Sequence, residues 1–186
     1  MSIELIGVHK AFGVNQVLKG FTLSVQDGDT LSVIGGSGTG KSVALKHIVG
    51  LLRPDQGEIW VDGENVSRLD LETLYVLRRR VGYVFQFAAL FDSMTIEENV
   101  GMGLRRMSDM TEAKIRSRVF DCLHLVDLDG YGDRFPSQLS GGQRKRAGFA
   151  RAIATEPKYL LYDEPTTGLD PVTTAVIDEL IVRMSD

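Results

Sequence analysis

The start of the chain alternates apolar and polar residues, a pattern that predicts short, half-buried strands. The runs "IELIGVHKAF" and "FTLSV" both show it, and we expect antiparallel strands with turns at Gly13 and Gly20. The next run, "TLSVIGG" at residues 30–36, is mostly apolar and ends in glycine. Such a run is typical of a parallel strand buried on both faces. The pattern therefore predicts an antiparallel sheet followed by the first strand of a parallel sheet.

Helical and extended patterns then alternate along the chain. We expect helices at residues 41–49, 70–79, 141–155 and 171–184, and strands at residues 57–63, 81–86 and 158–164. From residue 88 to about residue 128 the pattern is helical, and Thr111 is a suitable N-cap. This order predicts an α/β protein with a parallel core, an N-terminal antiparallel β subdomain and an inserted helical subdomain at roughly 88–145.

Composition narrows the function classes. The length of 186 residues suggests one domain, 1–186, and the net charge of −4 argues against a nucleic-acid partner. The only cysteine, Cys122, excludes an internal disulfide, and its apolar-periodic surroundings predict a core position. We find no signal peptide and no apolar run near the roughly 18 residues that a membrane span requires. We therefore expect a cytoplasmic protein that serves a membrane only as a peripheral partner.

The run "GGSGTGKS" fits the pattern G-x-x-x-x-G-K-[ST] of a phosphate-binding loop, between a predicted strand and a predicted helix. Its glycines let successive backbone N–H groups point at phosphate oxygens. Lys41 is expected to reach the β- and γ-phosphates, and Ser42 to offer its hydroxyl to Mg²⁺. The predicted nucleotide-binding residues here are Gly35, Gly36, Ser37, Gly38, Thr39, Gly40, Lys41, Ser42 and Val43.

Two acids complete this chemistry. Asp163 ends the predicted strand "KYLLYDE", where it could hold Mg²⁺ directly or through water. Glu164 follows and could orient or deprotonate an attacking water. Alone, such a pair could simply cap a strand, but the matching phosphate loop favours the catalytic interpretation.

A second glycine loop, Ser140-Gly141-Gly142-Gln143, precedes a predicted helix. It can be a plain N-cap, or it can bind an anion at the positive end of the helix. One nucleotide cannot easily use both loops of a single chain. The simplest arrangement that uses both loops is a C₂ dimer in which the second loop of each chain closes on the nucleotide of the partner.

Together, "LSGGQ", "GGSGTGKS" and "LLYDEP" resemble the ATP-binding cassette (ABC) ATPases of ABC transporters, over nearly the whole chain. The resemblance implies a P-loop NTPase core, ATP and Mg²⁺ as cofactors, a homodimer, and transmembrane permease subunits on the cytoplasmic side of the inner membrane. It implies that Gln86 senses Mg²⁺ and couples to the permease. It also implies that Asp170 belongs to a loop crossing the dimer interface and that Phe12 stacks on adenine. From the residues alone, Phe12 would be read as a core residue.

The segment "FQFAALFDSMTIEENV" is similar to the Mla-type ATPases of bacterial lipid transporters, which implies a phospholipid or other lipid substrate and an MCE-type substrate-binding protein as a further partner. Importer ATPases for amino acids or methionine remain the alternative. Residues 88–100 are unusually apolar for a loop, and we expect them to contact the coupling helix of the permease.

The chain departs from the family at one motif. ABC ATPases carry a later histidine that contacts the γ-phosphate, whereas His9, His47 and His124 all precede Asp163. We therefore expect the last core strands to be missing. Two possibilities stay open: the chain hydrolyses ATP, or it has a catalytically silent regulatory role. A soluble ABC-type ATPase acting on nucleic acid or ribosomes is disfavoured by the acidic charge. A GTPase is excluded because no Asn-Lys-x-Asp run occurs.

Overall fold

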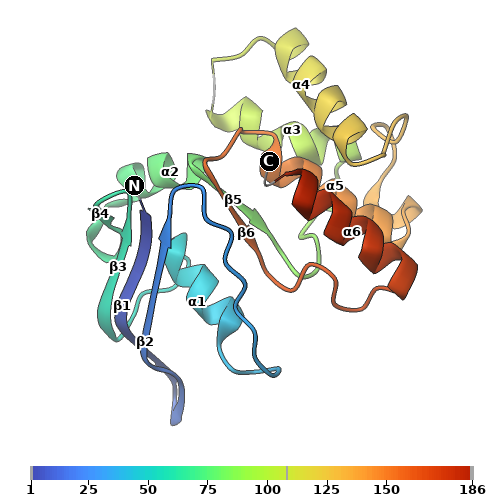
Figure 1. Ribbon diagram of the computed structural model, residues 1–186. Coiled ribbons are helices and arrows are strands. Elements are labelled where there is room, and N and C mark those ends of the chain that lie inside the picture. Colours follow the sequence, from blue (N-terminus) through green and yellow to red (C-terminus); the bar gives the residue numbers. More distant parts are fainter. Residues whose placement is uncertain (1, 108, 185–186) are drawn as a thin grey trace. The chain divides into compact units, whose positions relative to one another are not determined.

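The computed structural model describes residues 2–107 and 109–184 and divides the chain into two compact units, residues 1–78 and residues 79–186. Figure 1 follows the chain from the blue strands of the first unit to the red helix α6 of the second. Because each unit has its own core, we describe the two in turn.

The first unit is an antiparallel sheet with helices. Its sheet has the order β2-β1-β3-β4, with α1 packed against β2 and β3. Its elements are β1 (Ser2–Phe12), β2 (Asn15–Gln26), α1 (Lys41–Ile48), β3 (Gln56–Val61), β4 (Glu64–Asn65), the short helix η1 (Val66–Arg68) and α2 (Leu71–Arg79). Leu5, Ile59 and Val61 are fully buried in this sheet, as the alternating pattern predicts.

The two glycines predicted as turns behave differently. Gly13 lies in the turn between β1 and β2, as expected. Gly20 instead lies inside β2, with a φ of +77°, where the register shifts between the pairs Val8–Phe21 and His9–Lys19. It is therefore a bulge residue, and the prediction of a turn there was wrong. Glycine signals a left-handed backbone in both settings, so the sequence alone does not separate them.

The strand predicted at residues 30–36 does not form. Leu31 and Val33 are 49% and 42% exposed, Ile34 is 95% exposed, and the described strand pairings do not include this segment. A strand is defined by hydrogen bonds to a neighbouring strand, and an apolar run supplies side chains for packing but no partner. The composition was correctly read as apolar, but the strand assignment was wrong.

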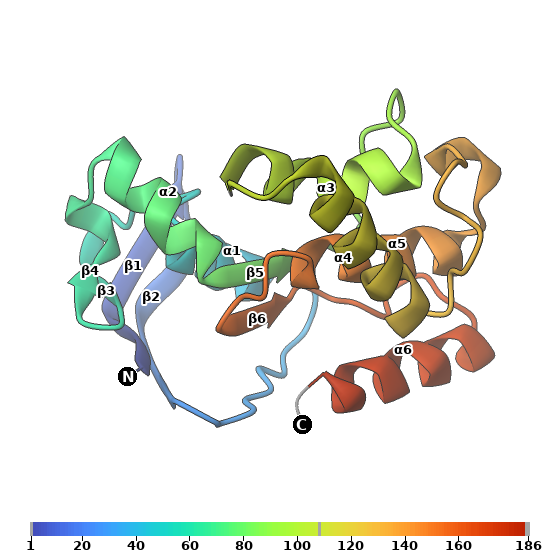
Figure 2. The same cartoon turned by 90° about the horizontal axis from the view of Figure 1, so that it is seen from above.

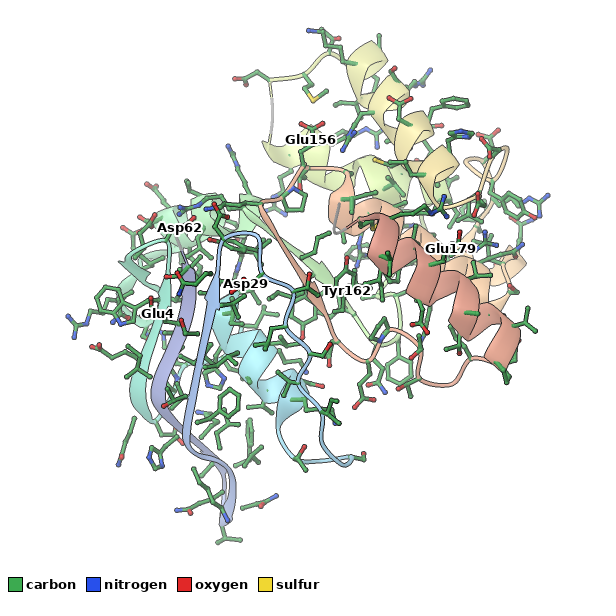
Figure 3. All side chains as sticks on the ribbon, viewed as in Figure 1. Glu4, Asp29, Asp62, Glu156, Tyr162 and Glu179 are labelled. Carbon is green, nitrogen blue, oxygen red and sulfur yellow. The ribbon has the colours of Figure 1, made fainter. Side chains whose placement is uncertain are left out.

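The second unit combines a parallel strand pair with several longer helices (Figure 2). Its elements are β5 (Val81–Val84), α3 (Ile96–Met107), α4 (Glu112–Leu125), the short helix η2 (Pro136–Gln138), α5 (Gly141–Ile153), β6 (Tyr159–Tyr162) and α6 (Pro171–Arg183). β5 and β6 pair in parallel from Val81–Tyr159 to Val84–Tyr162. Tyr162, labelled in Figure 3, packs its ring 5.5 Å from that of Phe149 on α5.

Side chains of α3, α4, α5 and α6 share one hydrophobic core in this unit. Cys122 is fully buried in it, as predicted, and burial raises the pKa of its thiol. Within the described ranges, no helix combines the length and apolar character needed to cross a bilayer.

The helical prediction for residues 88–128 holds only from Ile96 onward. Residues 88–95 form turns, and Ala88 and Ala89 have φ values of +58° and +50°, which an α-helix cannot contain. The N-cap predicted at Thr111 is confirmed, because its side chain accepts a hydrogen bond from Lys114 N at the start of α4. At the start of α2 the Asp70 side chain accepts a hydrogen bond from Thr73 N at 2.8 Å.

The close approach of β1 and β3 in the first unit predicts that Gly57 cannot be replaced by a residue with a side chain. Gly57 and Gly63 both have positive φ, +88° and +81°, but a Cβ at Gly57 would collide with the carbonyl oxygens of Ile6 and Gly7, whereas one at Gly63 meets nothing within 4 Å. We expect Gly63→Ala to lower the free energy of unfolding by about 1 kcal/mol, the strain alone, and Gly57→Ala by about 3 kcal/mol or more. Urea denaturation of both variants measures this, and equal losses would contradict the close approach of β1 and β3.

Candidate functional site

The loop of residues 35–42 is curled around its own lysine. Lys41 Nζ donates to the carbonyl oxygens of Gly35 at 3.0 Å and Gly36 at 2.9 Å, and the Thr39 hydroxyl also donates to Gly36 O, at 2.9 Å. Residues 35–39 are exposed. The loop therefore has the curved backbone of a phosphate cradle, with a cation folded onto it.

Gly40 joins this loop to the sheet and to α1. Its φ is +97°, and a Cβ there would lie 2.9 Å from side-chain carbons of Val17 and Leu18 on β2. Gly40 is the N-cap of α1, whose first turn carries no acidic residue. The positive end of the helix and the exposed loop amides thus face an environment that suits an anion, so the residues present fit a bound phosphate group.

Phe12 lies at the end of β1 in the same unit. Its side chain is 48% exposed, so the residue-level reading of Phe12 as core was wrong. Lys10 Nζ lies 5.7 Å from the centroid of its ring and forms a 2.7 Å ion pair with Asp55. The Asp55 carboxylate also accepts a hydrogen bond from Ala11 N, and these contacts, led by Lys10, lower its pKa. These contacts fix the end of β1 and leave the Phe12 ring accessible to a planar ligand.

The second unit brings three predicted residues to one edge of its strand pair. Asp163 directly follows β6, and its backbone N–H donates to Val84 O of β5 at 3.0 Å. Gln86 lies just beyond β5, and its Nε2 donates to Glu164 Oε2 at 3.2 Å. Glu164 has a φ of +47°, a strained backbone for a side chain of its size. The carboxyl ends of the two parallel strands therefore assemble two acids and an amide.

Tyr83 on β5 belongs to this group, although the sequence gives no local signal for it. Its hydroxyl donates to Asp163 Oδ2 at 3.0 Å, and Asp163 is only 5% exposed. Burial, together with the charge of Asp163, raises the pKa of Tyr83 far above its usual range. The phenol therefore stays protonated and holds one oxygen of the buried carboxylate.

The second glycine loop is a complete capping box. The Ser140 hydroxyl accepts from Gln143 N at 3.2 Å, and Gln143 Oε1 accepts from Ser140 N at 2.9 Å. Gln143 Nε2 also donates to the Tyr131 hydroxyl at 3.0 Å. Gly141 has open space where a Cβ would lie, whereas a Cβ at Gly142 would lie 2.5 Å from a side-chain carbon of Thr173 on α6. The loop is thus an N-cap whose backbone remains approachable at Gly141, which is compatible with both interpretations made from the sequence.

Asp170 is the N-cap of α6. Its Oδ1 accepts hydrogen bonds from Val172 N at 3.1 Å and Thr173 N at 3.0 Å. Thr173 is the largest cause of the lowered pKa of this carboxyl. The negative charge of Asp170 therefore complements the positive end of α6 and fixes where the preceding loop stops.

The turns at residues 87–95 present an apolar surface. Phe87 is 85% exposed and Phe91 is 48% exposed, while the buried Asn99 side chain holds the backbone behind them. Asn99 Oδ1 accepts from Phe91 N at 2.7 Å, and its Nδ2 donates to carbonyls of Phe91, Met94 and Thr95. Beside this segment a groove of about 880 Å³ is lined mostly by charged residues, together with Met94 and Met102.

The described residues contain no group of three or more His, Cys, Asp or Glu that could hold a metal ion. A cation here would need oxygen ligands from a bound phosphate group in addition to protein oxygens. That is the usual mode of Mg²⁺, which binds through one or two protein ligands plus substrate phosphates. In the second unit the oriented carboxylate of Asp163 is a protein ligand of this kind, and in the first unit the hydroxyl of Ser42 is another.

Comparison with known proteins supports one family. Residues 18–167 match the family model described as ABC transporter. The chain is 43% identical over 185 residues to the "probable ribonucleotide transport ATP-binding protein mkl" of Mycobacterium tuberculosis, covering 100% of this chain and 52% of that protein. It is 44% identical over 193 residues to the chloroplastic protein TRIGALACTOSYLDIACYLGLYCEROL 3 of Arabidopsis thaliana, covering 99% and 56%.

The sulfate/thiosulfate import ATP-binding protein CysA of Bordetella pertussis is 43% identical over 189 residues, covering 100% of this chain and 52% of that protein. Among solved structures, a dimeric post-hydrolysis ATP-binding cassette bound to ADP and Pi superposes with a TM-score of 0.90 at 33% identity, covering 99% of this chain and 83% of that one. Another, cbiO1 of Clostridium perfringens, gives 0.85 at 31%, covering 98% and 73%. The chain spans about half the length of the curated relatives it matches.

The hydrogen bond between Tyr83 and Asp163 can be tested by removing one oxygen atom. We expect Tyr83→Phe to lower the free energy of unfolding by about 1–3 kcal/mol, because a buried carboxylate loses a donor. Tyr162→Phe is the matched control, since in the described ranges the Tyr162 hydroxyl has no hydrogen-bond partner. Chemical denaturation at pH 7 compares them, and an equal effect of the two changes would argue against a specific role for Tyr83.

Proposed function

The chain belongs to the ABC transporter family, and from that premise we propose that it is the ATP-binding and hydrolysing subunit of an ABC transporter. The single observation that carries the proposal is the phosphate cradle of residues 35–42, with the Lys41 ammonium folded onto it. The acids and the amide beyond β5 and β6 supply the complementary chemistry. ATP is the nucleotide that the family match supports.

In this proposal the first unit binds ATP. The loop amides and Lys41 hold the phosphates, the N-terminus of α1 contributes its positive end, and Phe12 stacks on the adenine ring. Ser42, Gln86 and Asp163 are the residues that would hold Mg²⁺. When bound, that ion would offset phosphate charge.

Hydrolysis is assigned to Glu164, which would accept the proton of the attacking water. Gln86, hydrogen-bonded to its carboxylate at 3.2 Å, fixes where that carboxylate points. Lys41 would stabilise the negative charge that develops on the transferred phosphoryl group.

We further propose that two copies of the chain enclose two ATP molecules. The loop from Ser140 to Gln143 would close on the ATP of the partner, and the loop that ends at Asp170 would cross the interface. The approachable backbone at Gly141 supports this arrangement. A cassette of similar structure is described as dimeric with ADP and Pi bound, which supports it further.

The proposed membrane partners are permease subunits. The exposed Phe87 and Phe91 offer an apolar surface of the kind that receives a partner helix, and the charged groove beside them offers groups for ion pairs with that partner. The chain would then act as a peripheral subunit on the cytoplasmic side of the inner membrane. One similar structure is described as part of the ABC transporter complex cbiONQ, which supports such an assembly.

For the transported substrate we propose a phospholipid or another lipid, with an MCE-type protein as substrate carrier. The support is the Mla-like segment that follows Gln86 and a relative whose name contains that of a glycolipid. A small-solute importer is the second candidate, because a sulfate/thiosulfate import protein is 43% identical over the same range.

The shared-site dimer predicts a change of mass. A Glu164→Gln chain should bind Mg-ATP and barely hydrolyse it, because the proton acceptor is lost. Light scattering should therefore show its mass doubling with Mg-ATP. Adding Ser140→Arg should abolish the doubling by filling the approach to Gly141.

The matched control is Ser117→Arg in the same background, since Ser117 is exposed on α4 and is not part of either glycine loop. It should dimerise normally. A mass that stays constant while ATP is demonstrably bound would overturn the shared-site dimer.

The substrate class predicts what the native complex carries. We expect the complex, purified through a tag on a Glu164→Gln chain, to retain bound phospholipid. The amount should exceed that retained by an unrelated membrane protein complex purified in the same way. Lipid extraction followed by mass spectrometry measures this. Stimulation of the ATPase of the wild-type complex by sulfate or amino acids, without lipid enrichment, would instead favour the importer.

A further inference from the structure

Lys145 is a buried cation that the proposed chemistry does not use. The residue is 8% exposed, and its Nζ donates to the carbonyl oxygens of Pro165 and Thr167, both at 2.7 Å. Burial lowers the pKa of its ammonium group, and the charge of Glu164 acts in the opposite direction. Lysine is among the residue types least often buried, and a buried lysine is normally paired with other polar groups, as Lys145 is with these two carbonyls.

The two carbonyls flank the turn that follows Glu164. Thr167 N donates back to Glu164 O at 3.3 Å, and the Thr167 hydroxyl donates to Glu164 Oε2 at 3.1 Å. Fixing the backbone at Pro165 and Thr167 therefore also fixes the carboxylate of Glu164. Because the backbone of Glu164 is strained, it stays in this conformation only while its surroundings hold it.

Lys145 itself belongs to α5, the helix that begins with the Ser140–Gln143 loop. Lys145 lies in the second turn of this helix, and a Cβ at Gly142 of the same loop would collide with Thr173 of α6. A helix moves as a rigid element over such a short distance. The glycine loop and the segment of residues 164–170 are thus joined by one side chain with two short hydrogen bonds.

We propose that Lys145 is a positioning residue that ties the glycine loop at the start of α5 to the turn after Glu164 and so holds the Glu164 carboxylate ready for hydrolysis. The inference deepens the proposed function and rests on it for the hydrolytic step. In the proposed dimer these two segments belong to different ATP sites, so the tether would link closure at one site to the geometry of the other.

The test uses the full chain with Lys145→Met, which keeps the length of the side chain but removes its donors. Hydrogen exchange of the Thr167 and Leu169 amides reports the turn directly, because both donate within it, to Glu164 O and Thr166 O. We expect their exchange to rise by about tenfold or more. We expect kcat for ATP to fall by about tenfold while KM changes by less than about twofold, since the loop that binds ATP is untouched. Lys145→Arg, which keeps donors, should restore both.

Arg146→Met is the matched control. Arg146 is the next residue of α5 and also donates to two backbone carbonyls, Val126 at 3.0 Å and Asp127 at 2.9 Å, but these end α4 instead of following Glu164. It should lower thermal stability without accelerating exchange at Thr167 and Leu169.

Unchanged exchange in Lys145→Met, or an equal rise in Arg146→Met, would overturn the tether. Faster exchange with unchanged kcat would overturn its role in hydrolysis. If the wild-type chain itself neither binds nor hydrolyses ATP, the proposed function fails, and the exchange data still decide whether Lys145 holds the turn.

Discussion

The second unit depends on cations that donate to backbone carbonyls left unpaired by irregular segments. Turns between helices and strands leave such carbonyls without partners, and a buried carbonyl without a donor is costly. Helix α5 supplies the donors from several of its positions: Lys145 to Pro165 and Thr167, Arg146 to Val126 and Asp127, Arg144 to Leu139, and Arg151 to Ala88 and Ala89. The three basic residues 144–146 are thus all engaged with backbone carbonyls of the protein itself.

This arrangement explains why the candidate site residues of the second unit lie on short, irregular segments and yet have defined positions. The turn after Gln86 is held from one side by Arg151 and from the other by Asn99. The turn after Glu164 is held by Lys145. Each turn follows a strand of one parallel pair, so a change in the position of α5 would be felt at both. Chains of packed and hydrogen-bonded elements of this kind can carry energetic coupling between distant segments.

Much of this architecture could be predicted because it is encoded locally. Helix caps at Thr111 and Ser140 and the glycine-lysine loop of residues 35–42 each depend on neighbours within a few positions. What could not be predicted depends on distant partners. Tyr83 meets Asp163 only because β5 and β6 pair. The exposed apolar run at residues 30–36 forms no strand because none of the described strands pairs with its backbone. Arg151 and Lys145 gave no signal either, since their acceptors are backbone atoms, whose position no residue type reveals.

The burial of Cys122 has a practical consequence for following these segments in solution. It is the single cysteine of the sequence, it lies fully inside the helical core, and its raised pKa keeps it in the unreactive thiol form at neutral pH. The native chain therefore offers almost no background to maleimide chemistry. One cysteine introduced at an exposed position of α4, such as Ser117, would carry a fluorophore or spin label alone. Because the only thiol of the sequence is hidden in the folded core, the chain needs no cysteine removed before site-directed labelling.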